Sequence, residues 1–546
     1  MTSLFLKTSF ISLFVLLLNN TSYTQVVSDI DSLNKTYINW HLKGPNENKI
    51  EGIRLEKTYT KLLKNKNPKK KIVVAVIDSG VDTSHVELSG RIWKNEDEIP
   101  NDGIDNDLNG YTDDIYGWNF IGNTIGENLK SENLEYTRIY KKLNPRFQYI
   151  KSRTDVAANE LEEYKLYIAC KEKYNKELSN YQSQKNNIAS LIKKIETSDS
   201  IIKNYLKKET YTNTDVESIS SSDELIKNAK NIYLSNYKKN ISLKGIEPYL
   251  NHVELYLNKY LNLDFEPRTL LGDDPENIND TKYGNPDVMG PTPEHGTLVA
   301  GLIAAQRNNQ IGINGIAENV VIMPIRVVPE GDERDKDVAL AIRYAVDNGA
   351  NIINMSFGKA FSPQKEWVDS AIQYATEHHV LLVHASGNDG VNNDLIPHYP
   401  SSTYNNGSKA KTMITVGASN IYLDQELAAI FSNYGQSVDL FAPGVNIVSL
   451  YPGNKYNKTN GTSFSCPIVS GIAALIWSYY PDLSTEELKD ILLNSVTSYK
   501  KLSVYQPGLN SAKNEIVPFS QLSATGGILN GYKAIKLAEK TTKRKK

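Results

Sequence analysis

The stretch KKIVVAVIDSG, residues 70–80, decides the fold. It is a run of β-branched and small apolar residues that ends abruptly in Asp78, Ser79 and Gly80. An apolar run without polar alternation predicts a strand that is buried on both faces, as in a parallel sheet. The polar end of such a strand lies at the sheet edge where ligands bind in open α/β folds.

Similar apolar runs recur along the chain and alternate with helical segments. Five further strands are predicted, at residues 320–328, 350–356, 380–385, 413–418 and 437–441. Four helices are predicted beside them, at residues 296–305, 336–348, 367–377 and 464–479. This alternation predicts an α/β fold, an open parallel sheet with helices on both faces.

Residues 127–271 differ in composition from the rest of the chain. Between Phe147 and Lys244 there is neither Gly nor Pro, and Tyr or Ile stands at every seventh position from Tyr167 to Ile202. The pattern predicts a long amphipathic helix or a helical hairpin. We interpret the segment as an inserted, mainly α-helical subdomain without an assigned role. It divides the α/β domain into residues 69–126 and 272–540.

The N-terminus has the pattern of a secretory signal peptide over residues 1–24. Lys7 precedes an apolar core at residues 10–18, and small or polar residues follow up to a cleavage site expected before Gln25. The core is too short to span a membrane, and no other segment is apolar and long enough. We therefore expect a secreted or periplasmic protein, with residues 25–68 as an N-terminal arm or a short propeptide.

The charge balance excludes two classes of partner, and the cysteine content bears on disulfide formation. The chain has 61 basic and 63 acidic residues and a net charge of −2, which gives no case for nucleic acid or an anionic membrane surface as partner. Its two cysteines, Cys170 and Cys466, fall in the helical insertion and the α/β domain. We expect two separate thiols rather than a disulfide, and a monomeric protein.

Four polar residues stand at predicted strand ends or helix starts. Asp78 ends the first strand, His295 opens HGTLVAGLIAA, Asn388 follows an apolar strand, and Ser463 lies in GTSFSCP before an apolar helix. A parallel sheet brings such positions to one edge. Serine hydrolysis requires these parts: a hydroxyl nucleophile, an imidazole base, a carboxylate that orients the base, and an oxyanion donor.

In chain order, VAVIDSGVD, HGTLVAGLIAA, ASGNDG and GTSFSCP resemble the motifs of the subtilisin-like serine peptidases, the subtilase family or peptidase family S8. The resemblance covers roughly residues 70–125 and 272–480. The order Asp, His, Ser is the subtilisin order.

The resemblance implies a role for each of these residues. Asp78 orients His295, His295 takes the proton from Ser463, and Ser463 attacks the scissile carbonyl. Asn388 and the Ser463 backbone N–H hold the oxyanion, and no cofactor takes part in catalysis. The resemblance also implies polypeptide substrates with an apolar or aromatic P1 residue. It implies an extended substrate strand along six residues, Ser356, Phe357, Gly358, Ala385, Ser386 and Gly387.

The chain departs from the family pattern beside the site. Leu298 stands where a second His is common, and Phe464-Ser465 replaces the usual Met-Ala after the nucleophile. We expect these changes to alter the shape of the pocket without removing activity. Four further histidines match no motif and are interpreted as structural residues: His378, His379, His384 and His398.

The acidic stretch NDGIDNDLNGYTDD, residues 101–114, offers alternating oxygen ligands around Gly110. It is similar to the first part of a calcium loop, but Tyr116 stands where an EF-hand has its bidentate acid. Subtilases often carry structural calcium, so we expect a structural Ca²⁺ here; the alternative is a solvated acidic turn. The expected ligands are Asp105, Asp107, Asn109 and Asp113.

The predicted function is a secreted serine endopeptidase that acts through an acyl-enzyme. The alternative is a catalytically silent, subtilase-like scaffold that binds peptides. Competent residues at all four catalytic positions favour catalysis. An acyl esterase of the α/β-hydrolase type is disfavoured, because the nucleophile does not lie in a G-x-S-x-G motif and the triad order differs.

Overall fold

The structure is a computed structural model that describes residues 26–27, 30–45, 50–508 and 515–545. The predicted signal peptide, residues 1–24, lies outside the described residues. The chain divides into two compact units, one formed by Met1–Lys130 with Arg268–Lys546 and the other by Ser131–Pro267. The predicted insertion, residues 127–271, encloses the second unit.

The first unit is built on a nine-stranded sheet among the described residues. Its order is β11-β14-β8-β7-β6-β5-β2-β4-β3, and every pairing except β11 with β14 is parallel. All six predicted strands are confirmed. The strands are β2 (Ile72–Asp78), β3 (Trp118–Asn119), β4 (Val320–Arg326), β5 (Ile352–Met355), β6 (Leu381–Ala385), β7 (Met413–Ser419), β8 (Leu440–Pro443), β11 (Thr497–Ser498) and β14 (Gly527–Ile528).

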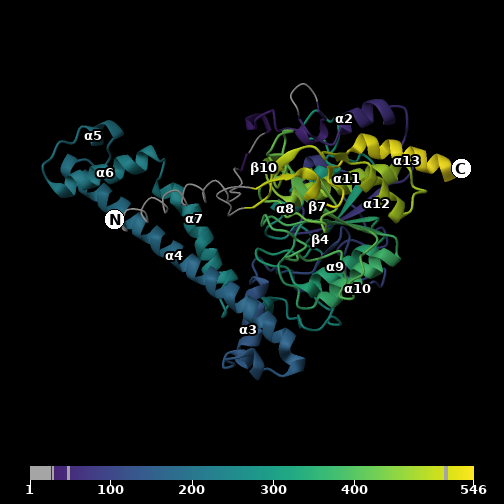
Figure 1. Cartoon of the computed structure of the whole chain (residues 1–546), viewed down its shortest axis with the longest axis horizontal. Helices are drawn as coiled ribbons and strands as arrows, with labels where there is room; N and C mark the ends of the chain where they lie inside the picture. Colours follow the sequence, from purple (N-terminus) through teal and green to yellow (C-terminus); the bar gives the residue numbers. More distant parts are fainter. Residues whose placement is uncertain (1–25, 28–29, 46–49, 509–514, 546) are drawn as a thin grey trace. The chain divides into compact units, whose positions relative to one another are not determined.

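Helices cover both faces of this sheet, as predicted (Figure 1). The side chains of β2 alternate between two core clusters: Ile72, Val74 and Val76 join one, and Ala75 and Ile77 join the other. A strand buried on both faces explains the unbroken apolar run. The first cluster includes α8 (Glu294–Ala304) and α11 (Thr462–Tyr479), and the second includes α9 (Asp335–Asp347) and α10 (Lys365–Glu377).

Smaller elements complete this unit. A three-stranded antiparallel sheet contains β1, β10 and β9, and a hairpin contains β12 and β13. The bounds are β1 (Val26–Val27), β9 (Ile447–Tyr451), β10 (Lys455–Thr459), β12 (Ser503–Tyr505), β13 (Ile516–Pro518), α2 (Leu55–Thr58), α12 (Thr485–Asn494) and α13 (Gly531–Lys545). Short 3-10 or π turns are η1 (Ile30–Ser32), η2 (Trp40–Leu42), η3 (Tyr59–Leu63), η4 (Val86–Leu88), η8 (Pro267–Leu270) and η9 (Phe519–Gln521).

The N-terminal arm is part of the core of this unit. Trp40, Leu42, Ile53 and Leu55 are almost fully buried in the cluster that contains α8 and α11. The indole Nε1–H of Trp40 donates to the backbone oxygen of Asn446 at 3.1 Å. Removal of this arm would expose a large apolar surface, which costs free energy roughly in proportion to its area.

Two buried arginines hold the chain where it leaves and re-enters this unit. The Arg326 guanidinium donates to the backbone oxygens of Ser79, Ile121 and Leu129. Arg268 donates to Asp337 at 2.6 and 2.8 Å and to Asp273 at 2.7 Å. Lys336 Nζ, fully buried, pairs with Asp273 at 2.7 Å. Both ends of the segment that leads to the helical unit are thus fixed by charge-assisted hydrogen bonds within the α/β unit.

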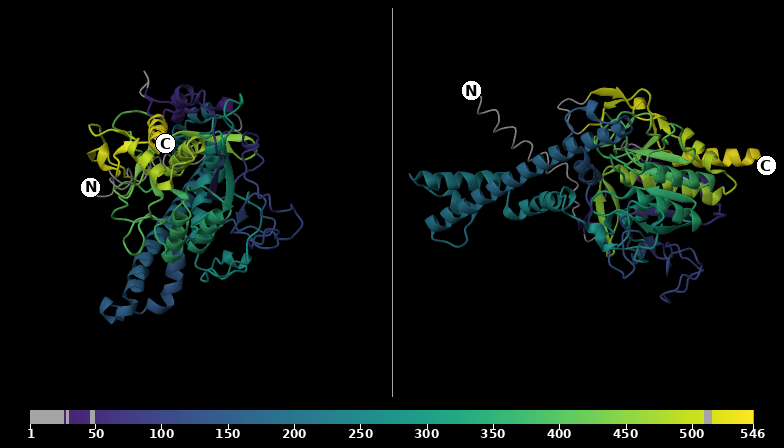
Figure 2. Two further views of the ribbon diagram at one scale, coloured as in Figure 1. Left: turned by 90° about the vertical axis from the view of Figure 1, so that its right-hand side faces the viewer. Right: turned by 90° about the horizontal axis from the view of Figure 1, so that it is seen from below.

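The helical unit is organised around one 46-residue helix, α4 (Figure 2). The seven-residue repeat places its aromatic rings against neighbouring helices: Tyr174 stacks on Tyr140 at 4.7 Å, and Tyr181 on Tyr256 at 3.9 Å, between ring centroids. The bounds are α3 (Glu135–Phe147), η5 (Arg153–Asp155), η6 (Ala158–Glu160), α4 (Leu161–Leu206), α5 (Asn213–Glu217), α6 (Glu224–Lys238), α7 (Leu243–Leu255) and η7 (Tyr256–Tyr260).

Among the described residues, α11 alone has the length and hydropathy of a membrane span, and 94% of it is buried inside the structure. It lies at the centre of the α/β unit against the strands of the sheet. Helix α11 is therefore a core helix of this unit.

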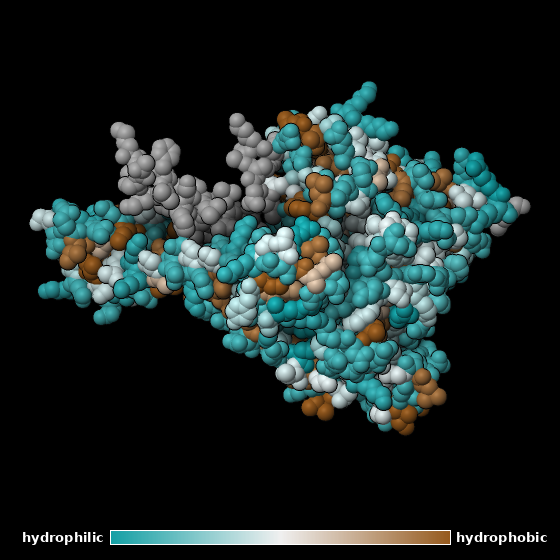
Figure 3. All heavy atoms as spheres, turned by 60° about the horizontal axis from the view of Figure 1, so that its bottom comes forward, coloured by the Kyte–Doolittle hydropathy of each residue, from teal (hydrophilic) through white to brown (hydrophobic). Residues whose placement is uncertain are grey.

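On the face shown in Figure 3, hydrophobic side chains form small groups among hydrophilic ones.

Candidate active site

Asp78 and His295 meet at the carboxyl end of β2. The Nδ1 atom of His295 lies 2.7 Å from Oδ1 of Asp78, which also accepts the Ser79 backbone N–H at 2.7 Å. Gly296 makes this contact possible, because a Cβ there would overlap the backbone oxygen of Gly80 and lie 3.2 Å from Cβ of Asp78. A glycine after His295 thus lets helix α8 approach the strand end closely.

This hydrogen bond sets the protonation of the imidazole. A carboxylate only accepts, so Nδ1 of His295 carries a proton and the neutral ring keeps its lone pair on Nε2. Burial lowers the pKa of His295, but the charge of Asp78 and its hydrogen bond outweigh burial and raise the pKa above its ordinary value. The Asp78 side chain is 1% exposed and that of His295 is 38% exposed. The imidazole therefore faces the cavity while its carboxylate partner is shielded.

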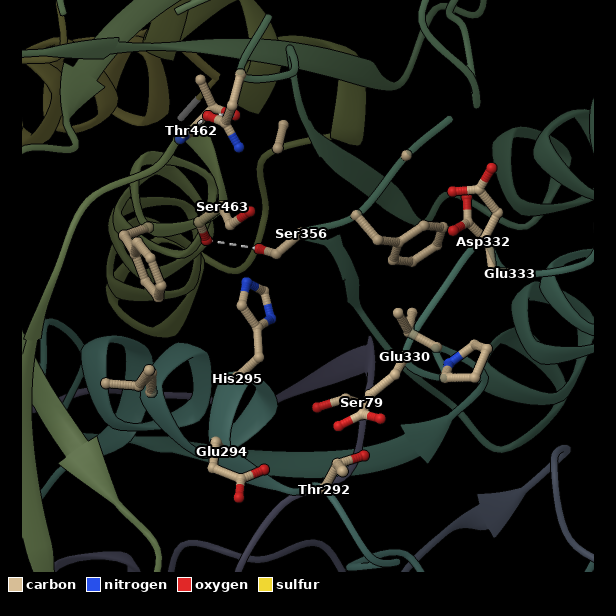
Figure 4. A pocket seen from close by; sticks show the side chains of 18 of the residues that line it. Ser79, Thr292, Glu294, His295, Glu330, Asp332, Glu333, Ser356, Thr462 and Ser463 are labelled. Carbon is tan, nitrogen blue, oxygen red and sulfur yellow. Dashed lines mark hydrogen bonds between the residues drawn. The ribbon is translucent and has the colours of Figure 1, made fainter. Parts of the chain in front are cut away.

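Ser463 is the second residue of α11, and its side chain lies near that of His295 on the same side of the cavity (Figure 4). The first N–H groups of a helix have no intrahelical partner and carry partial positive charge. The Ser356 hydroxyl donates to the backbone oxygen of Ser463 at 2.8 Å. This bond ties the start of α11 to the segment that follows β5.

A buried polar network behind Ser463 was not identified from the sequence. Asn354 on β5 donates to the Ser356 hydroxyl at 2.9 Å and accepts from the Ser470 hydroxyl at 2.8 Å and the Cys466 thiol at 3.2 Å. These bonds fix the register of α11 on the sheet. The signal in the sequence is Asn354 between apolar residues of a predicted strand, since a buried amide needs partners.

Asn388 lies beside the first turn of α11 and is oriented by it. Its Oδ1 accepts the backbone N–H of Thr462 at 2.9 Å and the Thr462 hydroxyl at 3.0 Å. Both bonds occupy the oxygen, so the Nδ2 donor of the amide remains for a group in the cavity that Asn388 and Ser463 line together.

These residues border a cavity of about 830 Å³. Its charged lining residues are mostly acidic: Glu294, Glu330, Asp332, Glu333 and Asp389, with Lys130 as the one Lys or Arg among the described residues that line it. Figure 4 shows Asp332 and Glu333 on the opposite side of the cavity from Ser463. A cavity of this size is typical of ligand-binding sites.

Five of the six predicted substrate-binding residues line this cavity: Ser356, Phe357, Gly358, Ala385 and Gly387. Ser386 is the exception, because its side chain is buried and donates to the backbone oxygen of Asn433 at 3.1 Å. The Ser386 side chain therefore points away from the cavity that Ala385 and Gly387 line.

Of the three residues that depart from the family pattern, Leu298 and Phe464 line the cavity, whereas Ser465 is buried and its hydroxyl donates to the backbone oxygen of Ala442 at 2.9 Å. The Phe464 ring lies 5.4 Å from the His295 ring between centroids, inclined by 48°. The Phe464 ring therefore lies against one side of the imidazole. Leu298, one turn after His295 on α8, also lines the cavity.

The acidic loop brings together a group that differs from the predicted ligand set. Carboxylate oxygens of Glu98, Asp105 and Asp107 lie within 4.8 Å of one another. Asp113 instead accepts the backbone N–H groups of Asp102 and Gly103, and Oδ1 of Asn109 accepts that of Tyr111. Glu98 was not predicted, since it stands seven positions before the repeat.

The donor set of this loop fits a hard cation. In the part of the chain that the structure describes, no Lys or Arg forms an ion pair with Glu98, Asp105 or Asp107. Three clustered carboxylates without a basic partner repel one another, and oxygen ligands are those that Ca²⁺ prefers.

Both cysteines are free thiols, as predicted, and both are buried. Burial raises the pKa of the Cys170 thiol to about 12. Neither thiol lines the cavity beside Ser463.

The parallel sheet and the aspartate, imidazole and hydroxyl at its edge are typical of serine hydrolases with the chain order Asp, His, Ser. The model of the subtilase family matches residues 69–515. The chain therefore belongs to the subtilase family of serine peptidases.

Relatives are similar over less than half of the chain. Subtilisin BL of Lederbergia lenta is 36% identical over 220 residues, which are 40% of this chain and 76% of the relative. An alkaline protease of Alkalihalobacillus alcalophilus is 36% identical over 220 residues, so this chain spans 54% of its length. Among solved structures, the prenylagaramide maturation protease PagA is 32% identical and covers 44% of this chain and 82% of its own, with a TM-score of 0.36.

Proposed function

We propose that this chain is a serine endopeptidase in which Asp78, His295 and Ser463 form the catalytic triad. The observation that carries the proposal is the 2.7 Å hydrogen bond between Asp78 and His295, which directs the second ring nitrogen to the cavity that contains Ser463. Family membership supports the same roles.

The proposed reaction begins when Nε2 of His295 takes the hydroxyl proton of Ser463 and Oγ bonds to the scissile carbonyl carbon. The Nδ2 donor of Asn388 and the backbone N–H of Ser463 hold the resulting oxyanion. The C–N bond then breaks, and His295 gives its proton to the leaving amine. Water hydrolyses the ester by the same steps in reverse and restores the Ser463 hydroxyl.

The substrate is proposed to be an extended polypeptide between two backbone segments. Residues 356–358 and 385–387 end neighbouring strands β5 and β6 and border the cavity on either side. Backbone pairing with a peptide gives affinity without dependence on its sequence.

Two further properties are proposed on separate grounds. Structural Ca²⁺ at the loop of Glu98, Asp105 and Asp107 would offset two of the three negative charges and hold the three side chains together. Secretion follows from the signal-peptide pattern of residues 1–24.

The decisive experiment is labelling of the purified protein with a fluorophosphonate, which reacts with activated serines. Labelling and peptide hydrolysis are expected in the native chain and in Ser408→Ala, whose serine lies on an exposed loop. Ser463→Ala is expected to abolish both. A folded native protein that neither reacts nor hydrolyses would support the silent scaffold, and preference for esters with no cleavage of peptides would support an esterase.

A further inference from the structure

His398 occupies the gap between the two backbone segments that border the cavity. A Cβ at Gly358 would overlap Nε2 of His398, and a Cβ at Gly387 would lie 3.0 Å from its Cε1. The outer edge of the imidazole therefore lies between residues 356–358 on one side and 385–387 on the other. Glycine at position 358 leaves room for the ring, and glycine at position 387 leaves room for the Asn433 amide and for the near edge of the ring.

Contacts of the imidazole ring and of the neighbouring backbone fix the position of His398. His384, buried on β6, stacks on His398 with ring centroids 5.7 Å apart, and Nε2 of His384 lies 2.8 Å from the backbone oxygen of Phe357. Tyr399 exchanges two backbone hydrogen bonds with Lys359, at 3.0 and 2.9 Å. These contacts make the position of His398 a fixed property of the cleft.

The chemistry of Ser463 determines which substrate side chain meets this ring. The attacked carbonyl lies at Ser463 and Asn388, and the P1 side chain leaves the carbon next to it. Both segments reach this point: the Ser356 hydroxyl is hydrogen-bonded to the backbone oxygen of Ser463, and Gly387 directly precedes Asn388 in the chain. The end of this gap that lies next to Ser463 is therefore the place where the P1 side chain enters. His398 lines the same cavity.

We propose that His398 is the floor of the P1 pocket and restricts it to short side chains, with Ser, Thr and Asn favoured among polar ones. The inference rests on the proposed function and replaces the apolar or aromatic P1 preference that the family resemblance implies with a preference for short side chains. Neither ring nitrogen of His398 has a hydrogen-bond partner among the described residues. A neutral imidazole offers one donor and one acceptor, which a short hydroxyl or carboxamide can satisfy.

Protonation of the ring fits this role. Burial lowers the pKa of His398 below its ordinary value, although the charge of Asp389 acts in the opposite direction. The ring is therefore neutral at neutral pH and does not attract an acidic P1 side chain by charge.

The test is kcat/KM for the purified full chain on peptides that differ only at P1, with Ala, Ser, Asn, Leu and Phe. The native protein is expected to prefer Ala, Ser and Asn over Phe by about ten- to a hundredfold. His398→Ala should open the pocket and raise the value for Phe to that for Ala or above. His398→Gln, similar in volume, should keep the restriction, and His378→Ala on the exposed end of α10 should change nothing.

A native preference for Phe or Leu over Ala would overturn the inference, as would an unchanged Phe-to-Ala ratio in a folded His398→Ala variant. If His398→Ala fails to fold, the native P1 series and His398→Gln still decide. Cleavage of none of the peptides, with no fluorophosphonate labelling of Ser463, would overturn the proposed function itself.

Discussion

Asp78 and His295 stand 217 residues apart in the chain and are joined by a 2.7 Å hydrogen bond. The bond forms because helix α8 begins directly against the end of β2, where Gly296 leaves no side chain in between. One consequence is electrostatic: a shielded carboxylate holds the positive form of the ring and so raises its pKa.

This relationship predicts the pH dependence of activity. Only neutral His295 accepts a proton from Ser463, so kcat/KM should fall as the pH drops, with the midpoint of that limb above the ordinary histidine pKa of 6.5. The raised pKa of His295 also affects the free energy of unfolding, and this contribution decreases as the pH rises, whereas activity increases. Protonated His295 stabilises the fold fully below the unfolded pKa, and this contribution is lost as the pH rises through the folded pKa.

Asp78→Asn tests the cause of that shift. Without the negative charge, the effect of burial remains, so the midpoint of the acid limb should move to lower pH. Because an amide also presents a donor to Nδ1, kcat should fall by roughly 10⁴-fold. An acid limb that stays in place in this variant would assign it to another group.

Asn388→Asp tests the proposed oxyanion donor. The aspartate keeps an acceptor for both Thr462 hydrogen bonds but replaces the Nδ2 donor. We expect kcat to fall by at least about 10²–10³-fold, which is the usual cost of removing one side-chain oxyanion donor from a subtilisin, with little change in KM. A rise in KM at constant kcat would instead mean that Asn388 binds substrate in the ground state.

Removal of calcium should destabilise the α/β unit. If the loop of Glu98, Asp105 and Asp107 holds Ca²⁺, excess calcium at 100 times Kd would stabilise the fold by about 2.7 kcal/mol, so a chelator should lower Tm. Asp105→Asn should lower Tm and make it insensitive to the chelator. Asp424→Asn, on an exposed turn, should keep the native response. An unchanged native Tm under a strong chelator would count against the site.

Truncation of Trp40 should destabilise the protein as a core substitution does. The side chain is fully buried and its indole is hydrogen-bonded, so Trp40→Ala should cost about 3–5 kcal/mol in the free energy of unfolding. Ile311→Ala, at a half-exposed position, should cost about 0.5 kcal/mol or less. Denaturant midpoints compare the two. Equal midpoints would mean that the arm is dispensable, as a removable propeptide would be.

The strands and the four catalytic candidates could be predicted because each belongs to a local pattern. An apolar run ending in Asp78, or a glycine after His295, is visible within a few neighbouring residues. Other features depend on contacts between distant segments. Trp40 is one large residue in a segment without periodicity, so its burial in the core is not visible in the sequence. Glu98 meets the acidic loop only because that loop folds back and hydrogen-bonds to its carboxylate. His398 resembles an ordinary histidine until its ring is found between two glycines.

The two arginines at the border of the α/β unit bear on how this chain can change during evolution or design. Arg326 fixes the outgoing segment at Leu129, and Arg268 fixes the returning segment at Asp337. We therefore expect the sheet to fold with a segment of another length or sequence between these two anchor points.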